Sequence, residues 1–373
     1  MNISPSPALK KPLWDDALWA LLLDYISRGQ VIPIVGPALS TITVEGRELT
    51  IQQYVAEQLA QSLSLRDVPP APTLNDVVSC YLRENQRDEL YVLYSRTGEI
   101  FQKTAFTPPD VLLRLAHISH FKMFVTTAFD PLLETAVNRV RFGGEQLAEV
   151  IRYAPHDAHD IDPVRIKQAP ATIFHLLGRV SCIPNEYVIS DEDFLEFVFA
   201  LQEHPPERLF DELESKHLLI LGGNLPDWVA RLFLRSTKGR RLSDSRQVYE
   251  ILADNVPSDT KLVSFLSDFS TRTKVFTGGA PQFIEQLWMR WKERFDESAG
   301  EAKPVTSGAP GRKLNAKPLF ISYSHPDRDA AFALKAGLEA AGFAVWLDTE
   351  RLGGGAAYDA KILSEKCRRA FAP

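Results

Sequence analysis

Two segments of the chain place glycine directly after an apolar run. Residues 36–40 read Gly-Pro-Ala-Leu-Ser after Val-Ile-Pro-Ile-Val, and residues 222–224 read Gly-Gly-Asn after Leu-Leu-Ile-Leu. A glycine at the end of a strand lets backbone N–H groups approach a phosphate, so both segments are candidates for binding a nucleotide. Each is also compatible with a plain turn after a buried strand. The candidate contacts are Gly36, Pro37, Ala38, Ser40, Gly222 and Asn224.

A third segment carries polar side chains. Residues 126–130 read Thr-Thr-Ala-Phe-Asp and follow Phe-Lys-Met-Phe-Val. Polar side chains at the end of a buried strand often line a site, which makes Thr127 and Asp130 candidates. Asp130 followed by Pro131 also predicts the start of a helix, because aspartate caps helices and proline favours the first helical position. The two interpretations are compatible.

His175 is the histidine with the most informative surroundings. It lies in Ile-Phe-His-Leu-Leu-Gly, residues 173–178. Histidine can act as a general base near neutral pH. A histidine among apolar neighbours is more often a buried structural residue, so the sequence leaves both roles open.

The sequence disfavours several kinds of chemistry. It contains no Gly-x-x-x-x-Gly-Lys-Ser/Thr loop, which disfavours P-loop phosphoryl transfer, and neither Gly-x-Ser-x-Gly nor His-Glu-x-x-His. The three cysteines, Cys80, Cys182 and Cys367, lack the spacing of metal ligands and of a disulfide framework. We therefore expect no metal site.

Composition and charge restrict the partners of the chain. Its 373 residues are 45% hydrophobic and 24% charged, as in folded globular proteins, and the net charge is −6. The negative balance predicts neither nucleic acid nor membrane as a partner. No uncharged apolar run reaches the roughly 18 residues that span a bilayer, and the N-terminus has no signal-peptide core, so we expect a cytoplasmic protein.

The elements that position these residues alternate along the chain. Apolar runs typical of strands are followed by segments of helical period, which indicates an α/β fold with a parallel sheet covered by helices on both faces. In such sheets, ligands bind at the carboxyl ends of the strands, where the segments above lie. The predicted strands are residues 31–35, 121–127, 186–190 and 218–223. The predicted helices are residues 14–25, 131–140, 227–234 and 283–295.

A change in composition divides the chain into two domains. Residues 297–316 are rich in Gly, Ser, Ala, Pro and charged residues, which is typical of a linker. The linker separates a first domain, residues 1–296, from a short second domain, residues 317–373. In the second domain, two strand-like runs, residues 317–324 and 343–348, flank a segment of helical period.

Taken in order, the three segments and the histidine resemble the sirtuin-like family of bacterial defence NAD-hydrolases. The likeness covers about residues 15–290 and includes Val-Ile-Pro-Ile-Val-Gly-Pro-Ala-Leu-Ser, Phe-Val-Thr-Thr-Ala-Phe-Asp, Ile-Phe-His-Leu-Leu-Gly and Leu-Leu-Ile-Leu-Gly-Gly-Asn. It implies a Rossmann-like fold, NAD⁺ as the substrate and no metal. It also implies hydrolysis of the nicotinamide–ribose bond, with His175 as the base and Asp130 ordering the loop. The implied biological role is abortive infection, in which NAD⁺ depletion kills a phage-infected cell.

The chain departs from this family in two places. The family's signature has asparagine where this chain has Ala128, and the resemblance implies that the asparagine orients the ribose or the attacking water. An alanine side chain offers no hydrogen-bonding group, so we expect this chain to be inactive, through an engineered substitution or a natural loss. The usual Gly-x-Gly of the first loop becomes Gly-Pro-Ala, and Pro37 removes an N–H donor. Deacetylation is disfavoured because three scattered cysteines cannot form the four-cysteine zinc module of sirtuin deacetylases.

The second domain resembles the start of a Toll/interleukin-1 receptor (TIR) domain. The likeness rests on Phe-Ile-Ser-Tyr-Ser, on Gly-Phe-Ala-Val-Trp and on the glycine-bearing loop that follows. Residues 317–373 cover less than half of such a domain, so we expect a truncated flavodoxin-like fold. Asp359 stands where enzymatic TIR domains are expected to carry glutamate, so we assign this domain no reaction. The resemblance implies TIR–TIR contacts that assemble a homo-oligomer or a filament.

Two other functions are compatible with the same residues. Ala128 and the altered first loop suit a sensor that binds NAD or ADP-ribose without turnover. A TIR-mediated signalling scaffold, in which the first domain is only structural, is the other alternative.

Overall fold

The computed structural model describes residues 14–85, 90–223, 250–253 and 273–295, together with the backbone of residues 319–321 and 345–347. The chain divides into two units, Met1–Gly300 and Glu301–Pro373. The predicted linker, residues 297–316, lies outside the described residues.

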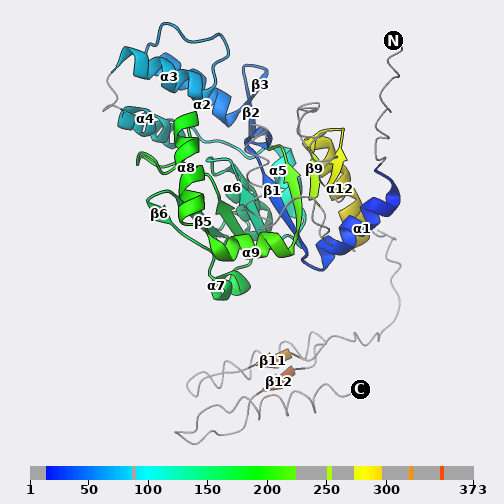
Figure 1. Ribbon diagram of the computed structural model, residues 1–373. Helices are drawn as coiled ribbons and strands as arrows, with labels where there is room; N and C mark the ends of the chain where they lie inside the picture. Colours follow the sequence, from blue (N-terminus) through cyan, green and yellow to red (C-terminus); the bar gives the residue numbers. More distant parts are fainter. Residues whose placement is uncertain are drawn as a thin grey trace, which may run out of the picture. The chain divides into compact units, whose positions relative to one another are not determined.

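The first unit is built on an eight-stranded sheet with the order β10-β9-β8-β1-β4-β7-β5-β6 (Figure 1). All neighbouring strands in it run parallel except β5 and β6. The predicted parallel α/β sheet is therefore confirmed. The strands are β1 (Val31–Val35), β4 (Met123–Thr126), β5 (Glu149–Ala154), β6 (Asp157–Ala158), β7 (Thr172–His175), β8 (His217–Leu221), β9 (Glu250–Ala253) and β10 (Thr273–Phe276).

Helices cover the sheet on both faces. Successive side chains of a strand point to opposite faces, so a strand whose residues are all apolar needs a helix layer on each side. In β1, Val31 and Val35 pack in one hydrophobic core, whereas Ile32 and Ile34 pack in the other. The first core is closed by α1 (Asp16–Ser27), α5 (Asp110–His117), α6 (Leu132–Phe142) and α12 (Ala280–Phe295). The second core is closed by α8 (Asp191–Glu203) and α9 (Glu207–Ser215), which lie across the sheet from α5 and α6 in Figure 1. The short helix α7 (Pro163–Gln168) has no buried residue.

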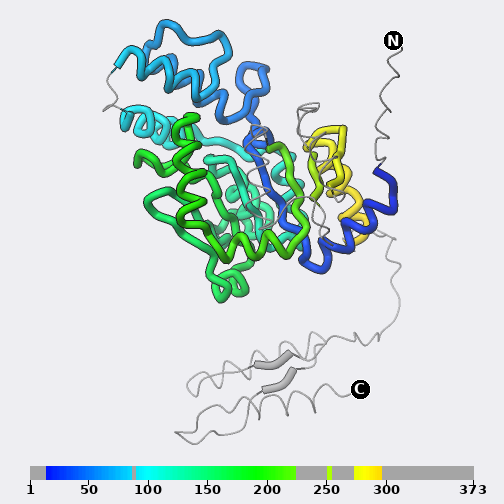
Figure 2. Tube along the Cα trace, viewed as in Figure 1, coloured from blue at the N-terminus to red at the C-terminus, as the bar shows by residue number. Residues whose placement is uncertain are grey.

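A helical module that the sequence analysis does not predict follows β1. The 3₁₀ turn η1 (Pro37–Leu39) leads into a hairpin of β2 (Thr41–Val44) and β3 (Arg47–Thr50), and then into three helices. Figure 2 shows these helices as the blue and cyan tubes beside α8. Capping boxes at Thr50 and Thr73 begin two of them. The helices are α2 (Ile51–Ser62), α3 (Leu74–Glu84) and α4 (Leu90–Lys103).

Most predicted elements lie in the described residues and are confirmed, with shifted ends. The predicted strand at residues 186–190 is wrong, since only Tyr187 forms an isolated bridge, with Gly178. The backbone N–H groups of Ile189 and Ser190 donate to the Asp193 carboxylate at 3.0 and 2.9 Å, which starts α8. The helix cap has therefore taken the donors that a strand would have used. The predicted helix at residues 227–234 lies outside the described residues.

The second unit contains two described strands. β11 (Leu319–Ile321) and β12 (Val345–Leu347) pair in parallel, with Leu319 opposite Val345. Both fall within the strands predicted at residues 317–324 and 343–348, while the rest of that unit lies outside the described residues. The resemblance to a TIR domain and its truncation stay predictions.

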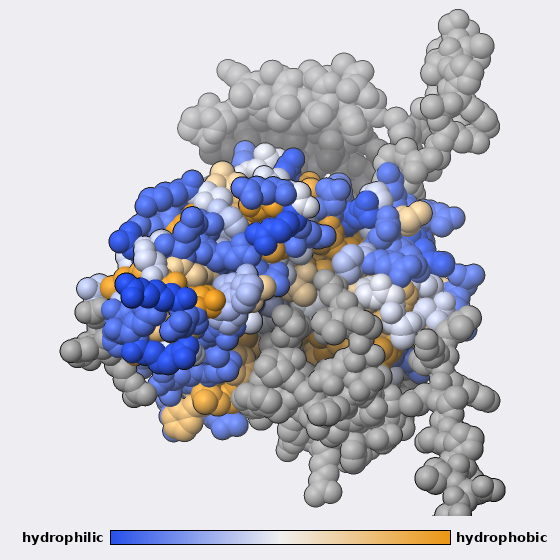
Figure 3. All heavy atoms as spheres, turned by 90° about the horizontal axis from the view of Figure 1, so that it is seen from above, coloured by the Kyte–Doolittle hydropathy of each residue, from blue (hydrophilic) through white to orange (hydrophobic). Residues whose placement is uncertain are grey.

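The surface of the first unit seen from above is mostly hydrophilic, with small groups of hydrophobic residues between the charged ones (Figure 3). Within the described part of the chain, no helix has both the length and the apolar character needed to cross a membrane.

Candidate functional site

The predicted segments meet at one edge of the sheet, because β8, β1, β4 and β7 are neighbours and all end there. The register places Val35 opposite both Leu221 and Thr126, and Thr126 opposite His175. The chain continues from β1 to β4 on one side and later returns to β8 on the other, so β1 borders the topological switch point. In open α/β sheets this is where ligands bind.

The loop after β4 is held by its own threonines. The Thr126 hydroxyl donates to the carbonyl of Val35 at 3.0 Å and accepts from the N–H of Ala128 at 3.0 Å. The N–H of Thr127 donates to the same Val35 carbonyl at 3.0 Å. These bonds fix the path of the chain between β4 and α6.

Asp130 joins this loop to the loop after β1. Its Oδ1 atom accepts from the Ser40 hydroxyl at 3.1 Å and from the N–H of Leu132 at 3.0 Å. The sequence predicted Asp130 as the N-cap and Pro131 as the first helical residue, but the N-cap is Pro131 and α6 begins one residue later, at Leu132. The prediction of the helix is confirmed, and that of its cap is wrong. The Asp130 side chain is buried, and burial raises the pKa of its carboxyl group.

His175 is the last residue of β7 and is fully buried. Its Nδ1 atom lies 3.1 Å from the carbonyl oxygen of Ala128. Its Nε2 atom lies 3.4 Å from Oε2 of Glu134, a contact at ion-pair distance that does not have hydrogen-bond geometry. The structure thus brings His175 and Ala128 together, as the sequence predicted. The roles assigned to the two residues stay predictions.

Glu134 and Arg179 belong to this cluster and were missed from the sequence. Arg179 donates to both carboxylate oxygens of Glu134, through Nε at 3.1 Å to Oε2 and through a terminal nitrogen at 2.5 Å to Oε1. Burial raises the pKa of Glu134, but its contacts with His175 and Arg179 outweigh burial and leave the pKa below its usual value. The sequence carries no local signal for this pair, because the two residues are far apart in the chain and each is an ordinary charged residue.

The loop after β1 packs directly on the loop after β8. The N–H of Gly36 donates to the carbonyl of Leu221 at 2.8 Å, and that of Ala38 to the carbonyl of Gly222 at 3.3 Å. A Cβ atom on Gly36 would lie 2.0 Å from the oxygen of Gly222, so no side chain fits there. The N–H groups of Leu39 and Ser40 donate to carbonyls of the same turn.

The predicted phosphate contact would therefore need N–H groups that already donate to carbonyls. It stays a prediction, and Asn224 lies outside the described residues. The hydroxyl of Thr127, by contrast, is buried and has no hydrogen-bond partner among the residues that the structure describes. Within the described ranges, no group of three or more His, Cys, Asp or Glu residues could hold a metal ion.

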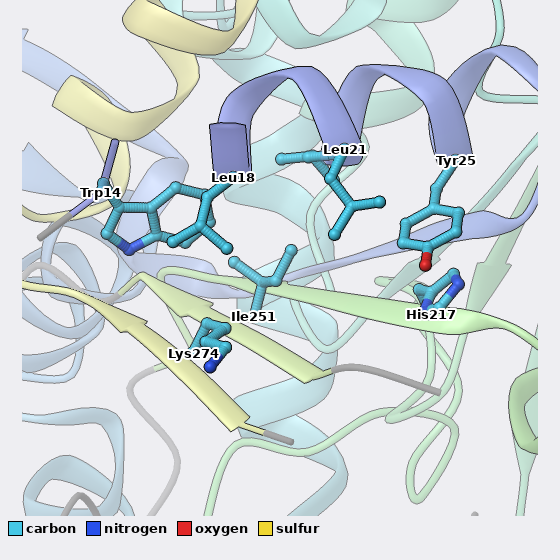
Figure 4. Close-up of a pocket in the computed structure, with 8 residues that line it drawn as sticks. Trp14, Leu18, Leu21, Tyr25, His217, Ile251 and Lys274 are labelled. Carbon is cyan, nitrogen blue, oxygen red and sulfur yellow. The ribbon is translucent and has the colours of Figure 1, made fainter. Parts of the chain in front are cut away.

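An apolar hollow lies elsewhere, between α1 and the strands β8, β9 and β10 (Figure 4). The Tyr25 ring stacks on His217 at one end, with 4.0 Å between the ring centroids. The predicted site residues are not part of this lining, which consists of Trp14, Leu18, Leu21, Leu22, Tyr25, His217, Ile251 and Lys274.

Residues 122–272 match a family model described as a SIR2-like domain. The match supports a sirtuin-like fold. The SIR2-like region begins just before β4 and includes Ala128, His175 and Gly222, whereas the loop of residues 36–40 precedes it. A comparison with curated proteins finds no match.

The SIR2-like match is consistent with NAD-related chemistry, because SIR2-like domains bind NAD⁺. The TIR resemblance, the role in phage defence and the assembly into oligomers stay predictions.

Proposed function

We propose that the first unit binds NAD⁺ at the ends of β8, β1, β4 and β7. We further propose that it hydrolyses the nicotinamide–ribose bond when residue 128 is asparagine, and that Ala128 leaves the present chain without turnover. The observation that carries the proposal is the position of Ala128. It lies at the end of β4 within the SIR2-like region, in contact with His175.

The proposed reaction needs few catalytic groups. Water adds to the anomeric carbon of the ribose, the bond to nicotinamide breaks with its electrons, and the water gives up one proton. Nicotinamide carries a positive charge before it leaves and needs no acid. The protein must orient the ribose and the water, which asparagine can do with its amide and alanine cannot. Loss of one such group costs roughly 10²–10⁴ in rate.

The test compares three proteins: the present chain, the variant Ala128→Asn and the isosteric control Ala128→Leu. NAD⁺ binding is measured by calorimetry, and nicotinamide release is measured by chromatography. We expect the present chain and Ala128→Asn to bind NAD⁺, and only Ala128→Asn to release nicotinamide. Absence of release from Ala128→Asn, in a folded protein that binds NAD⁺, would contradict the hydrolase.

The second candidate is a sensor that binds NAD or ADP-ribose without turnover. The backbone of residue 128 is held by hydrogen bonds, but its alanine side chain has no polar atom that could take part in a reaction. Binding without release by every variant supports the sensor. Absence of nucleotide binding contradicts both functions and supports the scaffold.

A further inference from the structure

The ring of His175 lies between two groups that accept hydrogen bonds. A carbonyl oxygen can only accept, so the contact between Nδ1 and the oxygen of Ala128 places the proton of the neutral ring on Nδ1. Nε2 then carries the lone pair and is the basic nitrogen. It lies 3.4 Å from Oε2 of Glu134 without a hydrogen bond, because a lone pair and a carboxylate are both acceptors. A proton that reaches Nε2 would find its acceptor in Glu134.

A base at this position has to hold a positive charge away from water. The side chain of His175 is fully buried, and burial disfavours the charged form of a histidine. An opposite charge within a few ångströms of the ring favours the charged form. The base therefore needs a negative neighbour at the moment when it takes a proton.

Two buried carboxyl groups interact with the charge of His175, and Glu134 is the one placed to pair with it. Oδ1 of Asp130 already accepts two hydrogen bonds, and burial raises the pKa of its carboxyl group, which favours the neutral form. The pKa of Glu134 is below its usual value because its contacts with His175 and Arg179 outweigh its burial. Glu134 therefore carries the negative charge that the ring needs.

Two arginine side chains belong to the surroundings of the pair. Arg179 donates to both carboxylate oxygens of Glu134 and so fixes the carboxylate beside Nε2. Arg152 on β5 lies opposite His175 in the register of the sheet, and its guanidinium is paired with Glu186 at 2.6 Å. The first arginine thus holds the carboxylate in place, and the second has a carboxylate of its own.

We propose that Glu134 is a positioning residue for the base, whose carboxylate accepts from Nε2–H once His175 has taken a proton and so stabilises the protonated ring. Water adds to the anomeric carbon, the electrons of the broken bond leave with nicotinamide, and the proton that the water gives up goes to Nε2. The ring releases this proton to solvent before the next turnover. The proposal rests on the proposed function, with His175 as its base.

The test compares Glu134→Gln with Glu186→Gln, both made in the Ala128→Asn protein. Glutamine keeps the shape of glutamate and removes its charge. Glu186 is a matched control, because it is mostly buried and bonded to an arginine, but has no ion pair with His175 among those that the structure describes. We expect Glu134→Gln to lower kcat for nicotinamide release roughly 10- to 100-fold with KM within about threefold, and Glu186→Gln to lower kcat by less than about threefold.

The positioning role is overturned if a folded Glu134→Gln protein keeps the kcat of its parent, if its loss lies in KM and not in kcat, or if Glu186→Gln loses as much. A second measurement needs no activity. ¹⁵N spectra of the histidine-labelled present chain, and of its Glu134→Gln and Glu186→Gln variants, report the share of His175 rings that carry a proton on both nitrogens. We expect this share, at the same mildly acidic pH, to be lower in Glu134→Gln than in the other two proteins, and equal shares overturn the role.

The present chain provides a further readout if Glu134→Gln does not fold. In the protonated ring, an Nε2 proton that is protected from exchange with water supports the hydrogen bond to Glu134. An Nε2 proton that exchanges freely with water overturns it.

The two proposals fail in different ways. If Ala128→Asn binds NAD⁺ but releases no nicotinamide, the proposed hydrolase is wrong, and the ¹⁵N spectra still decide whether Glu134 pairs with the protonated ring. If Ala128→Asn releases nicotinamide and the added Glu134→Gln substitution leaves the rate unchanged, the hydrolase stands and the positioning role is wrong.

Discussion

The two sides of β1 are joined to their neighbouring loops by different means. Toward β4 and β7, the loops are joined by buried polar side chains, among them Ser40, Asp130 and His175. Toward β8, the described parts of the loops are joined by backbone hydrogen bonds, and Gly36 lies against Gly222 without room for a side chain. A substitution of a polar side chain on the first side can leave the backbone in place, whereas a side chain at Gly36 requires the backbone to move.

The hydrogen bonds that the structure describes for residue 128 use its peptide groups and not its side chain. A substitution at this position therefore keeps the donor and the acceptor of both bonds.

The largest effect is expected on the glycine side, from Gly36→Ala. The added Cβ would lie 2.0 Å from the backbone oxygen of Gly222, and backbone cannot move aside as a flexible side chain can. We expect the free energy of unfolding to fall by about 3 kcal/mol or more, measured by urea denaturation. The control is Gly223→Ala, whose nearest added contact is 3.8 Å, and we expect it to change stability by less than about 1 kcal/mol. Equal effects of the two substitutions would contradict the close packing of the loops.

A smaller loss is expected on the polar side, from Arg179→Leu. It leaves the buried Glu134 carboxylate without its hydrogen bonds from Arg179. We expect a cost of about 2 kcal/mol, because Arg179 is itself partly exposed. The double variant Glu134→Leu/Arg179→Leu removes both charges, so its loss should be less than the sum of the single losses. Urea denaturation of the present chain, the two single variants and the double variant measures the interaction free energy between Glu134 and Arg179. If the two single losses add up to the loss of the double variant, the interaction between the two side chains does not stabilise the fold.

The same pair predicts a response to acid. The pKa of Glu134 is below its usual value in the folded protein, so the stability that this group contributes is present above the unfolded value of 4.5 and is lost as the pH falls through the folded value. Arg179→Leu removes a contact that lowers the pKa of Glu134, so the loss of stability in acid should be smaller in this variant. The free energy of unfolding of both proteins is measured by urea denaturation at a series of decreasing pH values.

The smallest effect is expected from Asp130→Asn. The asparagine oxygen can still accept from Ser40 and Leu132, so both hydrogen bonds are kept while a buried charge is removed. Because the folded pKa of Asp130 is raised above its usual 3.8, the present chain loses stability as the pH rises from 3.8 through the folded value. We expect the variant to be up to about 1 kcal/mol more stable at neutral pH and to lose this advantage in acid. An advantage that is the same at every pH would contradict the raised pKa.

The fold could be predicted from the sequence to the extent that its signals are local. The apolar run 31–35 became β1 with the same ends, and the periodic segment 283–295 lies within α12. The run 186–190 was misjudged because its donors belong to the cap formed by Asp193, a competition that hydrophobicity does not show. The helices α2, α3 and α4 were not predicted, although two of them begin with capping boxes.

The candidate site was predicted less completely than the fold. His175 and Asp130 were found because they stand out among apolar neighbours at the ends of strands. Glu134 and Arg179 were not found, because each is an ordinary charged residue in the sequence and the two are 45 residues apart. What distinguishes the pair is the burial of Glu134 beside His175 and its contact with Arg179.

The sequence by itself determined where the strands β1, β4 and β8 lie and which polar residues follow them, because burial on both faces of a parallel sheet demands an apolar run at each strand. Only the tertiary structure decided which of those residues meet. The order of the strands brings His175 to Ala128, packs Gly36 on Gly222 and encloses Glu134 with Arg179. These contacts depend on which strands are neighbours, and the strand order is set by the packing of the whole sheet and its helices.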